Sequence, residues 1–338
     1  MKLSLIICTY MRPQSLQQLL QSVQVQTVFP DEILIIDGSV NQETEQMIAQ
    51  KKVANLRYFL VPESFRGLTK QRNFGLDQVA STSDIVAFLD DDTELSPTYF
   101  EALIDTFSAD ATISGVGGVA VNENGWSLTV PDTKYDANRY FQFEGFIYKE
   151  GQRNVVRNYL GLHSNVGPGR MPEYSHGKTC GFPLTGLIYE VDLLVGMSFA
   201  FRKRVFDSLR FSTYFEGYGL YEDADFSIRA LQFGKNVINT KVQLNHYHHP
   251  SGRPNSYKYG KMVVRNGWYV WRTKNANPDI SATFKWHAIT LLLTLIRFAN
   301  AITTIAKKEA FTEAVGRTVG WWSLWFRKPK ETKNAIKY

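Results

Sequence analysis

Cysteine is nearly absent from this chain: 338 residues contain only Cys8 and Cys180, far apart in the sequence. Two distant thiols supply neither a disulfide framework nor the close spacing of a structural zinc site, which favours a reducing compartment. The opening MKLSLIICTYMRP holds an apolar run that is too short for a signal peptide, and Arg12-Pro13 interrupts it. Together these absences predict a cytoplasmic protein.

The sequence also lacks internal repeats, low-complexity segments and a strong charge excess. Its 44% hydrophobic and 21% charged residues are ordinary for a globular protein. The net charge of +6 owes much to the basic C-terminal stretch RKPKETKNAIKY. Such a tail suits an anionic membrane surface or plain solubility, and it supports nucleic-acid binding only weakly, so we expect no nucleic-acid partner.

Apolar runs alternate with helical patterns through the first 90 residues. The runs at 3–8, 32–37, 56–61 and 84–89 predict strands, and helical patterns separate them. Because these strands are apolar throughout, we expect an α/β fold whose mostly parallel, Rossmann-like sheet is covered by helices on both faces. Ligands of such sheets bind beyond the carboxyl ends of the strands, where Tyr10, Asp37 and the acidic run 90–92 are expected.

The acidic run FLDDDTELSP has two interpretations. Asp90, Asp91 and Asp92 are consistent with the N-terminus of a helix over PTYFEALIDTF, where the helix dipole stabilises acids. Three adjacent carboxylates, however, disfavour their joint ionisation unless a cation offsets the charge. Carboxylates that act together with substrate phosphates are typical ligands of Mg²⁺ or Mn²⁺.

The remainder of the chain divides into three stretches. Residues 122–190 lose periodicity and are rich in glycine and aromatic residues, which predicts a functional or mobile insert. The segment EDADFSIRALQFG predicts a helix that Gly234 closes, followed by strand-like sequence up to His246 and His248. Residues 256–338 are aromatic, basic and helical in pattern, and we expect them to form a C-terminal region.

Six motifs in order resemble glycosyltransferase family 2, with its GT-A fold, over residues 1–255. They are IICTYMRP, IIDGS, GLTKQRNFGL, FLDDDTELSP, VGMSFAFRK and YEDADFSIR. The resemblance implies an inverting transferase that moves a sugar from a nucleoside diphosphate donor to an acceptor hydroxyl. The multiple membrane helices and the Gln-x-x-Arg-Trp motif of the family's processive synthases are not found in the sequence, which favours addition of a single sugar.

The resemblance also implies roles for individual residues. Thr9, Tyr10 and Asp37 would hold the nucleotide base, and Arg72 would contact the same pocket or the pyrophosphate. Asp92 would bind Mn²⁺ or Mg²⁺, and Asp90 and Asp91 would divide the remaining contacts, with the ribose and, for Asp90, also with the metal.

The acid pair in YEDADFSIR would supply catalysis, with Asp223 as general base and Glu222 beside it. The alternative is that both acids only cap the following helix. For the metal-binding histidine, His246 is the first choice and His248 the second, although a loop histidine is more often structural. Arg253 would contact the diphosphate or remain solvated.

The expected partners are a nucleotide-sugar and a glycan or lipid-linked acceptor in bacterial cell-surface glycan synthesis. A uridine donor is favoured by its frequency in the family, with dTDP- and GDP-sugars as alternatives. A sugar nucleotidyltransferase is less consistent with the sequence, because CTYMRPQSL is not glycine-rich. A non-catalytic nucleotide- or carbohydrate-binding protein on this fold is a further alternative.

The segment 288–308 is the most hydrophobic part of the chain, but Arg297 and Asn300 interrupt it. On one helix, Thr290, Thr294, Arg297, Ala301, Thr304 and Lys308 would form a weakly polar stripe. Such a helix lies on the inner face of the plasma membrane or forms a homo-oligomer or domain interface, and a full membrane span is the least favoured alternative. The following VGWWSLWFRKPK combines tryptophans with basic residues, as interfacial anchors do.

Overall fold

The computed structural model describes residues 1–164, 166–175, 177–178, 181–215, 217–248 and 254–330. Its contacts divide the chain into two compact units. Among the described residues, the first unit comprises segments of Met1–Asn124 and Leu184–Gly252, and the second comprises segments of Gly125–Pro183 and Arg253–Glu331. The insert expected at 122–190 therefore belongs largely with the C-terminal helices. The functional division after residue 255 stays a prediction.

The first four strands form the predicted parallel part of the main sheet, in the order β4-β1-β2-β3. They are β1 (Leu3–Thr9), β2 (Glu32–Asp37), β3 (Leu56–Leu60) and β4 (Ile85–Asp90). The parallel register pairs Thr9 with Asp37 and Cys8 with Asp90, so the carboxyl ends of three strands are level. The prediction that polar residues gather at this edge is confirmed for these strands.

The other half of the sheet contains both strand directions. It is built from β5 (Thr93–Leu95), β6 (Ile113–Ala120), β10 (Ile188–Val191), β11 (Ser198–Arg202) and β12 (Lys235–His246). Strand β11 runs antiparallel to both β4 and β6, whereas β6 and β12 are parallel. Strand β12 also pairs with β5, directly after the acidic run. This pairing brings His246 opposite Thr93, from a distance of more than 150 residues in the sequence.

Helices cover both faces of the parallel strands, as predicted. They are α1 (Pro13–Gln24), α2 (Glu43–Ala49), α3 (Leu68–Gln78), α4 (Tyr99–Ala109) and α6 (Glu222–Ala230). Leu5 and Ile7 pack in one core with residues of α1 and α4. Ile6 points to the opposite face, since neighbouring side chains of a strand alternate. There α3 approaches so closely that a Cβ at Gly75 would lie 2.9 Å from Ile6 Cγ2.

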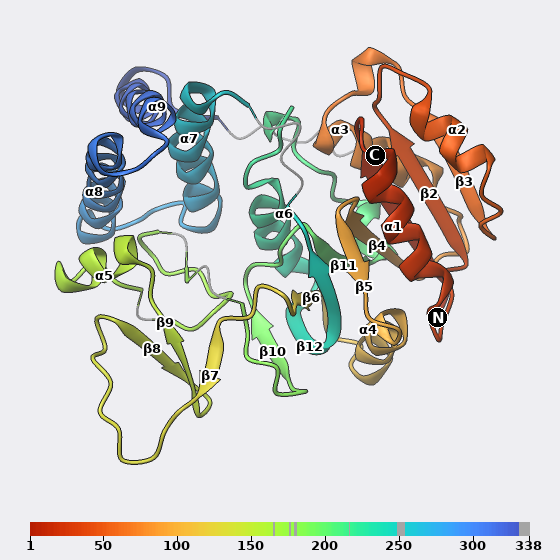
Figure 1. The fold of residues 1–338 in the computed structure, drawn as a ribbon, viewed down its shortest axis with the longest axis horizontal. Coiled ribbons are helices and arrows are strands. Elements are labelled where there is room, and N and C mark those ends of the chain that lie inside the picture. Colours follow the sequence, from red (N-terminus) through yellow and green to blue (C-terminus); the bar gives the residue numbers. More distant parts are fainter. Residues whose placement is uncertain (165, 176, 179–180, 216, 249–253, 331–338) are drawn as a thin grey trace. The chain divides into compact units, whose positions relative to one another are not determined.

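The described part of the second unit contains a small antiparallel sheet and a group of helices (Figure 1). The sheet has the order β7-β9-β8, from β7 (Trp126–Leu128), β8 (Tyr140–Phe143) and β9 (Phe146–Lys149). The helices are α5 (Gln152–Tyr159), α7 (Ser256–Lys274), α8 (Ile280–Thr303) and α9 (Lys307–Phe326). The contacts of α9 with both α7 and α8 hold this helical group together.

The expectation of one helix through residue 308 is wrong. Helix α8 ends at Thr303, Thr304 is extended with φ −110° and ψ 166°, and a new helix begins at Lys307. The run of β-branched residues from Ile302 to Ile305 weakens helix propensity at this point. Lys308 therefore lies on α9 rather than on the stripe of α8. By length and composition, α8 is the one helix among the described residues that is long and apolar enough to cross a membrane.

Candidate active site

The acidic run lies at the end of β4, and it does not cap α4. Asp90 is the last residue of that strand, and β5 follows immediately at Thr93. Helix α4 begins only at Tyr99, with Thr98 at its N-cap. The helix-cap interpretation of the three aspartates is therefore wrong, and their carboxylates lie at the edge where β1, β4 and β12 end.

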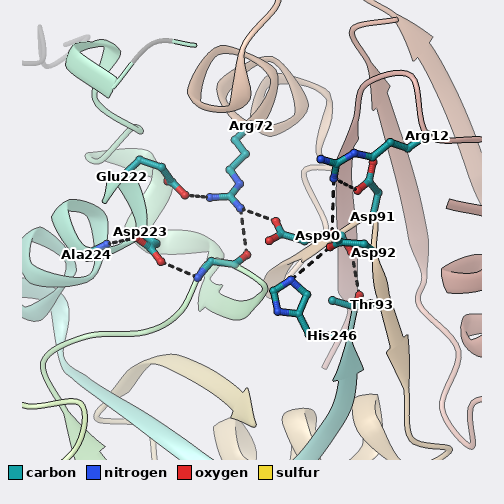
Figure 2. A network of polar contacts seen from close by, with 11 residues as sticks. Arg12, Arg72, Asp90, Asp91, Asp92, Thr93, Glu222, Asp223, Ala224 and His246 are labelled. Atoms are coloured by element: carbon teal, nitrogen blue, oxygen red, sulfur yellow. Dashed lines mark hydrogen bonds and ion pairs between the residues drawn. The ribbon is translucent and has the colours of Figure 1, made fainter. Parts of the chain in front are cut away.

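Each aspartate has different partners, as Figure 2 shows. Asp91 is buried, accepts a hydrogen bond from Thr9 Oγ1 at 2.7 Å and pairs with Arg12 at 2.9 Å. Asp92 is also buried, with one oxygen 3.7 Å from Arg12 and the other 3.4 Å from His246 Nε2. Asp90 is half-buried and lies 3.4 Å from Arg72. Thr9 and Arg12 thus hold Asp91, whereas Asp90 and Asp92 face the space beside His246.

Arg72 is a rare fully buried arginine, and it connects the acidic run to α6. Its guanidinium pairs with Glu222 and donates a hydrogen bond to the carbonyl of Gly196 at 3.0 Å. It also stacks near the rings of three phenylalanines, with 4.8 Å to the centroid of Phe199. The apolar surroundings and the ion pairs fix the position of this side chain.

The acid pair Glu222-Asp223 opens α6. Glu222 is buried, and its Oε2 has no hydrogen-bond partner among the described residues. Asp223 is more exposed, and its two oxygens accept hydrogen bonds from the N–H groups of Gly196 at 2.9 Å and Ala224 at 2.8 Å. Tyr221, directly before the pair, has the strained φ of 70°. The Gly196 peptide thereby joins Arg72, through its carbonyl, to Asp223, through its N–H.

Electrostatics distinguish this group from an ordinary ion pair. Burial raises the pKa of Asp90 to about 6 and that of Glu222 to about 8, although the positive charge of Arg72 acts in the opposite direction on both. One guanidinium offsets one carboxylate, so the second acid favours its protonated form when no cation is bound. The site therefore holds more acidic groups than Arg72 can keep ionised, and a bound cation would favour their ionised forms.

The residues present fit a divalent cation. Ligand atoms of Asp90, Asp92 and His246 lie within 4.8 Å of one another. Two carboxylates and one imidazole form a donor set that suits Mn²⁺, and Mg²⁺ accepts the carboxylates. His246 Nδ1 is buried and makes no hydrogen bond with the described residues. Burial lowers the pKa of His246, but the hydrogen bond to Asp92 and the surrounding carboxylates raise it overall.

A second group around His246 was missed in the sequence. Glu123 lies 3.1 Å from His246 Nδ1 and 2.7 Å from His248 Nε2, and the three also meet the spacing for a metal ion. His246 thus belongs to both groups, while His248 belongs only to the one with Glu123. The clustered histidines suggested the site, but no pattern indicated Glu123, which follows β6 in the irregular stretch.

The residues expected to hold the base lie on neighbouring strands. Asp37 is fully buried, and its oxygens already accept hydrogen bonds from Ser39 N–H and Tyr58 Oη, each at 2.8 Å. Tyr10 is exposed at the end of β1. The structure therefore joins Asp37 to the loop after β2, and its contact with a base stays a prediction. Arg253 and Cys180 lie outside the described residues.

Arg12 is another residue that sequence reasoning missed as part of the site. It lies within the TYMRP segment and pairs with Asp91, so the end of the first strand contributes Thr9 and the residues after it contribute a cation. Its position two residues after the exposed Tyr10 was the available signal. Met197, in the motif VGMSFAFRK, packs in the hydrophobic core.

Solved structures identify the fold class. The chain resembles GalNAc-T7, crystallised with UDP, GalNAc and Mn²⁺, with a TM-score of 0.52 and 16% identity over 78% of this chain and 48% of that one. It resembles residues 1–349 of S. aureus TarS with a TM-score of 0.51 and 14% identity, over 96% of this chain and 80% of that one. The fold is the GT-A fold of glycosyltransferases, as predicted.

The sequence comparison then identifies the family of the matched segment. Residues 4–164, just under half of the chain, match the family model described as Glycosyl transferase family 2, and this segment belongs to that family. A glucosyl-dolichyl phosphate glucuronosyltransferase of Haloferax volcanii is 29% identical over 39% of this chain and 42% of its own length.

Two bacterial relatives match shorter segments. A GalNAc(5)-diNAcBac-PP-undecaprenol beta-1,3-glucosyltransferase of Campylobacter jejuni is 34% identical over 28% of this chain and 30% of its own length. A UDP-Gal:alpha-D-GlcNAc-diphosphoundecaprenol beta-1,3-galactosyltransferase of Escherichia coli is 33% identical over 31% and 38%. The chain thus matches less than half the length of these curated relatives.

Proposed function

We propose that this chain is a glycosyltransferase that moves one sugar, with inversion, from a nucleoside diphosphate donor to a hydroxyl of a lipid-linked glycan. The family assignment supports the reaction class, and the names of three relatives support a lipid-linked acceptor. Its place would be the synthesis of bacterial cell-surface glycans.

The observation that carries the proposal is the connected group formed by the acidic run and the start of α6. Arg72 contacts both Asp90 and Glu222, and the Gly196 peptide contacts both Arg72 and Asp223. A glycosyl transfer needs a cationic site for the leaving diphosphate and a base for the acceptor hydroxyl, close to each other. This group supplies candidates for both within one compact unit.

Asp223 is the proposed general base. The two backbone N–H groups that bond its oxygens orient the carboxylate, and each oxygen keeps a further lone pair for a proton. It would take the proton of the acceptor hydroxyl as that oxygen attacks the anomeric carbon and the diphosphate leaves. Glu222, buried against Arg72, would hold the guanidinium in place and so act as a positioning residue.

The cation site is proposed at Asp90, Asp92 and His246, with His248 as the alternative histidine. A bound Mn²⁺ or Mg²⁺ would neutralise negative charge on the departing diphosphate. Asp91 is already bound by Thr9 and Arg12, so we do not include it among the metal ligands. It would instead contact the ribose or stabilise the loop.

The base pocket is proposed at Tyr10 and Asp37, next to Thr9. A UDP-sugar is the favoured donor, and the name of the Escherichia coli relative supports it. Because Asp37 already accepts two hydrogen bonds, contact with a base would require a further lone pair or a change of the Tyr58 partner.

The first experiment is thermal unfolding with UDP, dTDP, GDP, ADP and CDP, each with and without Mn²⁺. We expect UDP to raise the melting temperature only when the metal is present, because the diphosphate and the carboxylates share the cation. Asp92→Ala should remove this shift, whereas Asp105→Ala, an exposed acid on α4, should retain it. If no nucleotide changes the transition with any metal, the proposed donor site is wrong.

A further inference from the structure

The helical group of the second unit leaves a long apolar stripe uncovered. On α8, Ile280, Phe284, Leu291, Leu295 and Ile302 are exposed, Phe284 to 71% and Leu295 to 65%. Their spacings of four and seven residues place them on one face of the helix. The stripe extends for about 33 Å at 1.5 Å per residue.

The opposite face of α8 is already occupied. Trp286 and Ile289 are buried there, and Arg297 Nε donates to Glu313 of α9 at 2.8 Å. Only 17% of the most apolar window of α8 is buried. A helix that is apolar on both faces belongs in a core or in lipid, so its second face requires a cover.

Helix α9 continues the apolar surface with aromatic residues at its C-terminal end. Trp322, Trp325 and Phe326 are exposed, and Arg327 and Lys328 follow them, also exposed. Tryptophan next to basic residues is the composition found at the interface between a bilayer and water. At the other end of α9, Lys307 and Lys308 are exposed.

The charge of this region indicates what covers the apolar stripe. Residues 280–330 contain eight basic and two acidic side chains, a net of +6, which equals the formal charge of the whole chain. The other residues therefore balance, with 30 of each sign. A second copy of the chain would bring another +6 close to the same region and repel the first, whereas an anionic lipid surface attracts it.

A full span is inconsistent with the same contacts. Arg297, Glu313 and Arg317 form one ion-pair group along the face where α8 meets α9, and α9 also carries Glu309, Lys307 and Lys308. Charged groups inside a bilayer are costly, and α9 is not apolar enough to enter with its partner. A pair of helices lying in the interface keeps these charges near water.

We propose that α8 and α9 dock the protein on an anionic membrane surface, with the apolar stripe of α8 and the aromatic end of α9 in the lipid interface. This extends the proposed function by naming the surface where a lipid-linked acceptor would be met. The docking itself depends only on the second unit, so it stands or fails separately from the donor site.

The test is co-sedimentation of the full chain with phosphatidylcholine vesicles that contain or lack phosphatidylglycerol. We expect binding mainly to the anionic vesicles and weaker binding at high salt. Phe284→Ser combined with Leu295→Ser should lower the partition coefficient at least tenfold, because each side chain loses its apolar burial. Arg327→Gln and Lys330→Gln should each lower it about fivefold.

The matched control is Leu128→Ser, which removes an apolar side chain of the same 71% exposure from β7 of the same unit. It should leave vesicle binding unchanged. Circular dichroism and the melting temperature establish that each variant is folded.

Three results would overturn the proposal. One is wild-type protein that stays in the supernatant with anionic vesicles, and another is equal binding to both kinds of vesicle. The third is a dimer in sedimentation velocity that Phe284→Ser with Leu295→Ser dissociates, which would assign the stripe to a second copy. The nucleotide-dependent thermal shift should be the same in all these variants, so a failed donor site and a failed membrane site give different results.

Discussion

Two ion-pair groups in this molecule have opposite ratios of acidic to basic side chains. In the first unit, the single guanidinium of Arg72 pairs with two carboxylates, Glu222 and Asp90. In the second unit, the single carboxylate of Glu313 pairs with two guanidiniums, Arg297 and Arg317, at 2.8 Å each. The first group therefore has more acidic than basic side chains, and the second has more basic than acidic side chains.

The difference shows which group is built for a ligand. An excess of acidic side chains beside Asp92 and His246 is a setting that a bound cation would complete, and one Glu222 oxygen of the same group has no hydrogen-bond partner among the described residues. The Glu313 group instead satisfies both of its carboxylate oxygens and connects two positions of α9 to α8. It stabilises a helix pair, and its excess charge suits the anionic surface proposed for that pair.

The largest expected effect is on turnover, and it distinguishes the active-site group from the Glu313 group. Asp223→Asn removes the proposed base while the side chain keeps its shape, and turnover should fall by about 10²–10⁴-fold. Binding of the nucleoside diphosphate with Mn²⁺ should remain, as measured by thermal shift. The matched variant in the other group, Glu313→Gln, should leave turnover nearly unchanged. Full activity in Asp223→Asn would remove this residue from the mechanism.

The next effect concerns stability. Arg72→Met leaves buried Glu222 and half-buried Asp90 without the guanidinium between them, and it should lower the free energy of unfolding by about 3–5 kcal/mol. The control is Arg210→Met, whose pair with Asp77 is exposed and should contribute less than about 1 kcal/mol. Urea unfolding monitored by circular dichroism measures both. Similar losses for the two arginines would contradict the central role of Arg72.

A smaller loss of stability is expected when the ion pairs of Glu313 are removed. Glu313→Gln leaves Arg297 and Arg317 without a carboxylate, but both are partly exposed and can turn to water. The free energy of unfolding should decrease by about 1–3 kcal/mol. Thermal unfolding, compared with that of Glu309→Gln at the exposed start of α9, measures it. A loss as large as that for Arg72→Met would mean that the two groups are equally sensitive.

The smallest expected effect is a dependence of stability on pH in the metal-free protein. Burial raises the pKa of Glu222 to about 8, so the folded protein holds a proton that the unfolded chain releases near pH 4.5. Stability should therefore decrease as the pH rises between these values, because unfolding releases that proton and a higher pH favours its release. Glu222→Gln should flatten this part of the profile, measured by urea unfolding with EDTA at several pH values. An identical slope in both proteins would contradict the assignment.

Much of the first unit can be predicted from the sequence because its signals are local. Four apolar runs and the helices between them specify parallel strands, and the residues that follow those strands must share one edge. The acidic run, Arg72 and the Glu222-Asp223 pair were recognised by their motifs. What the sequence did not reveal were partners that come from distant segments, such as Arg12 for Asp91 and Glu123 for His246.

The break at Thr304 and the exposed face of α8 also required the structure. A helical pattern specifies which residues share a face, but it does not specify which of two apolar faces finds a partner. Likewise, the glycine-rich insert gave no periodicity from which the three strands of the small sheet could be located.

The sequence by itself determined where the first four strands lie, the family and the presence of three carboxylates at a strand end. These features depend on residues close together in the chain. Only the tertiary structure decided how those carboxylates divide. Asp91 lies with Arg12 and Thr9, Asp90 with Arg72, and Asp92 with His246. Long-range pairing of β12 beside β5 and the burial of α3 against the sheet set these distances, and electrostatic interactions depend on distance and burial rather than on sequence order.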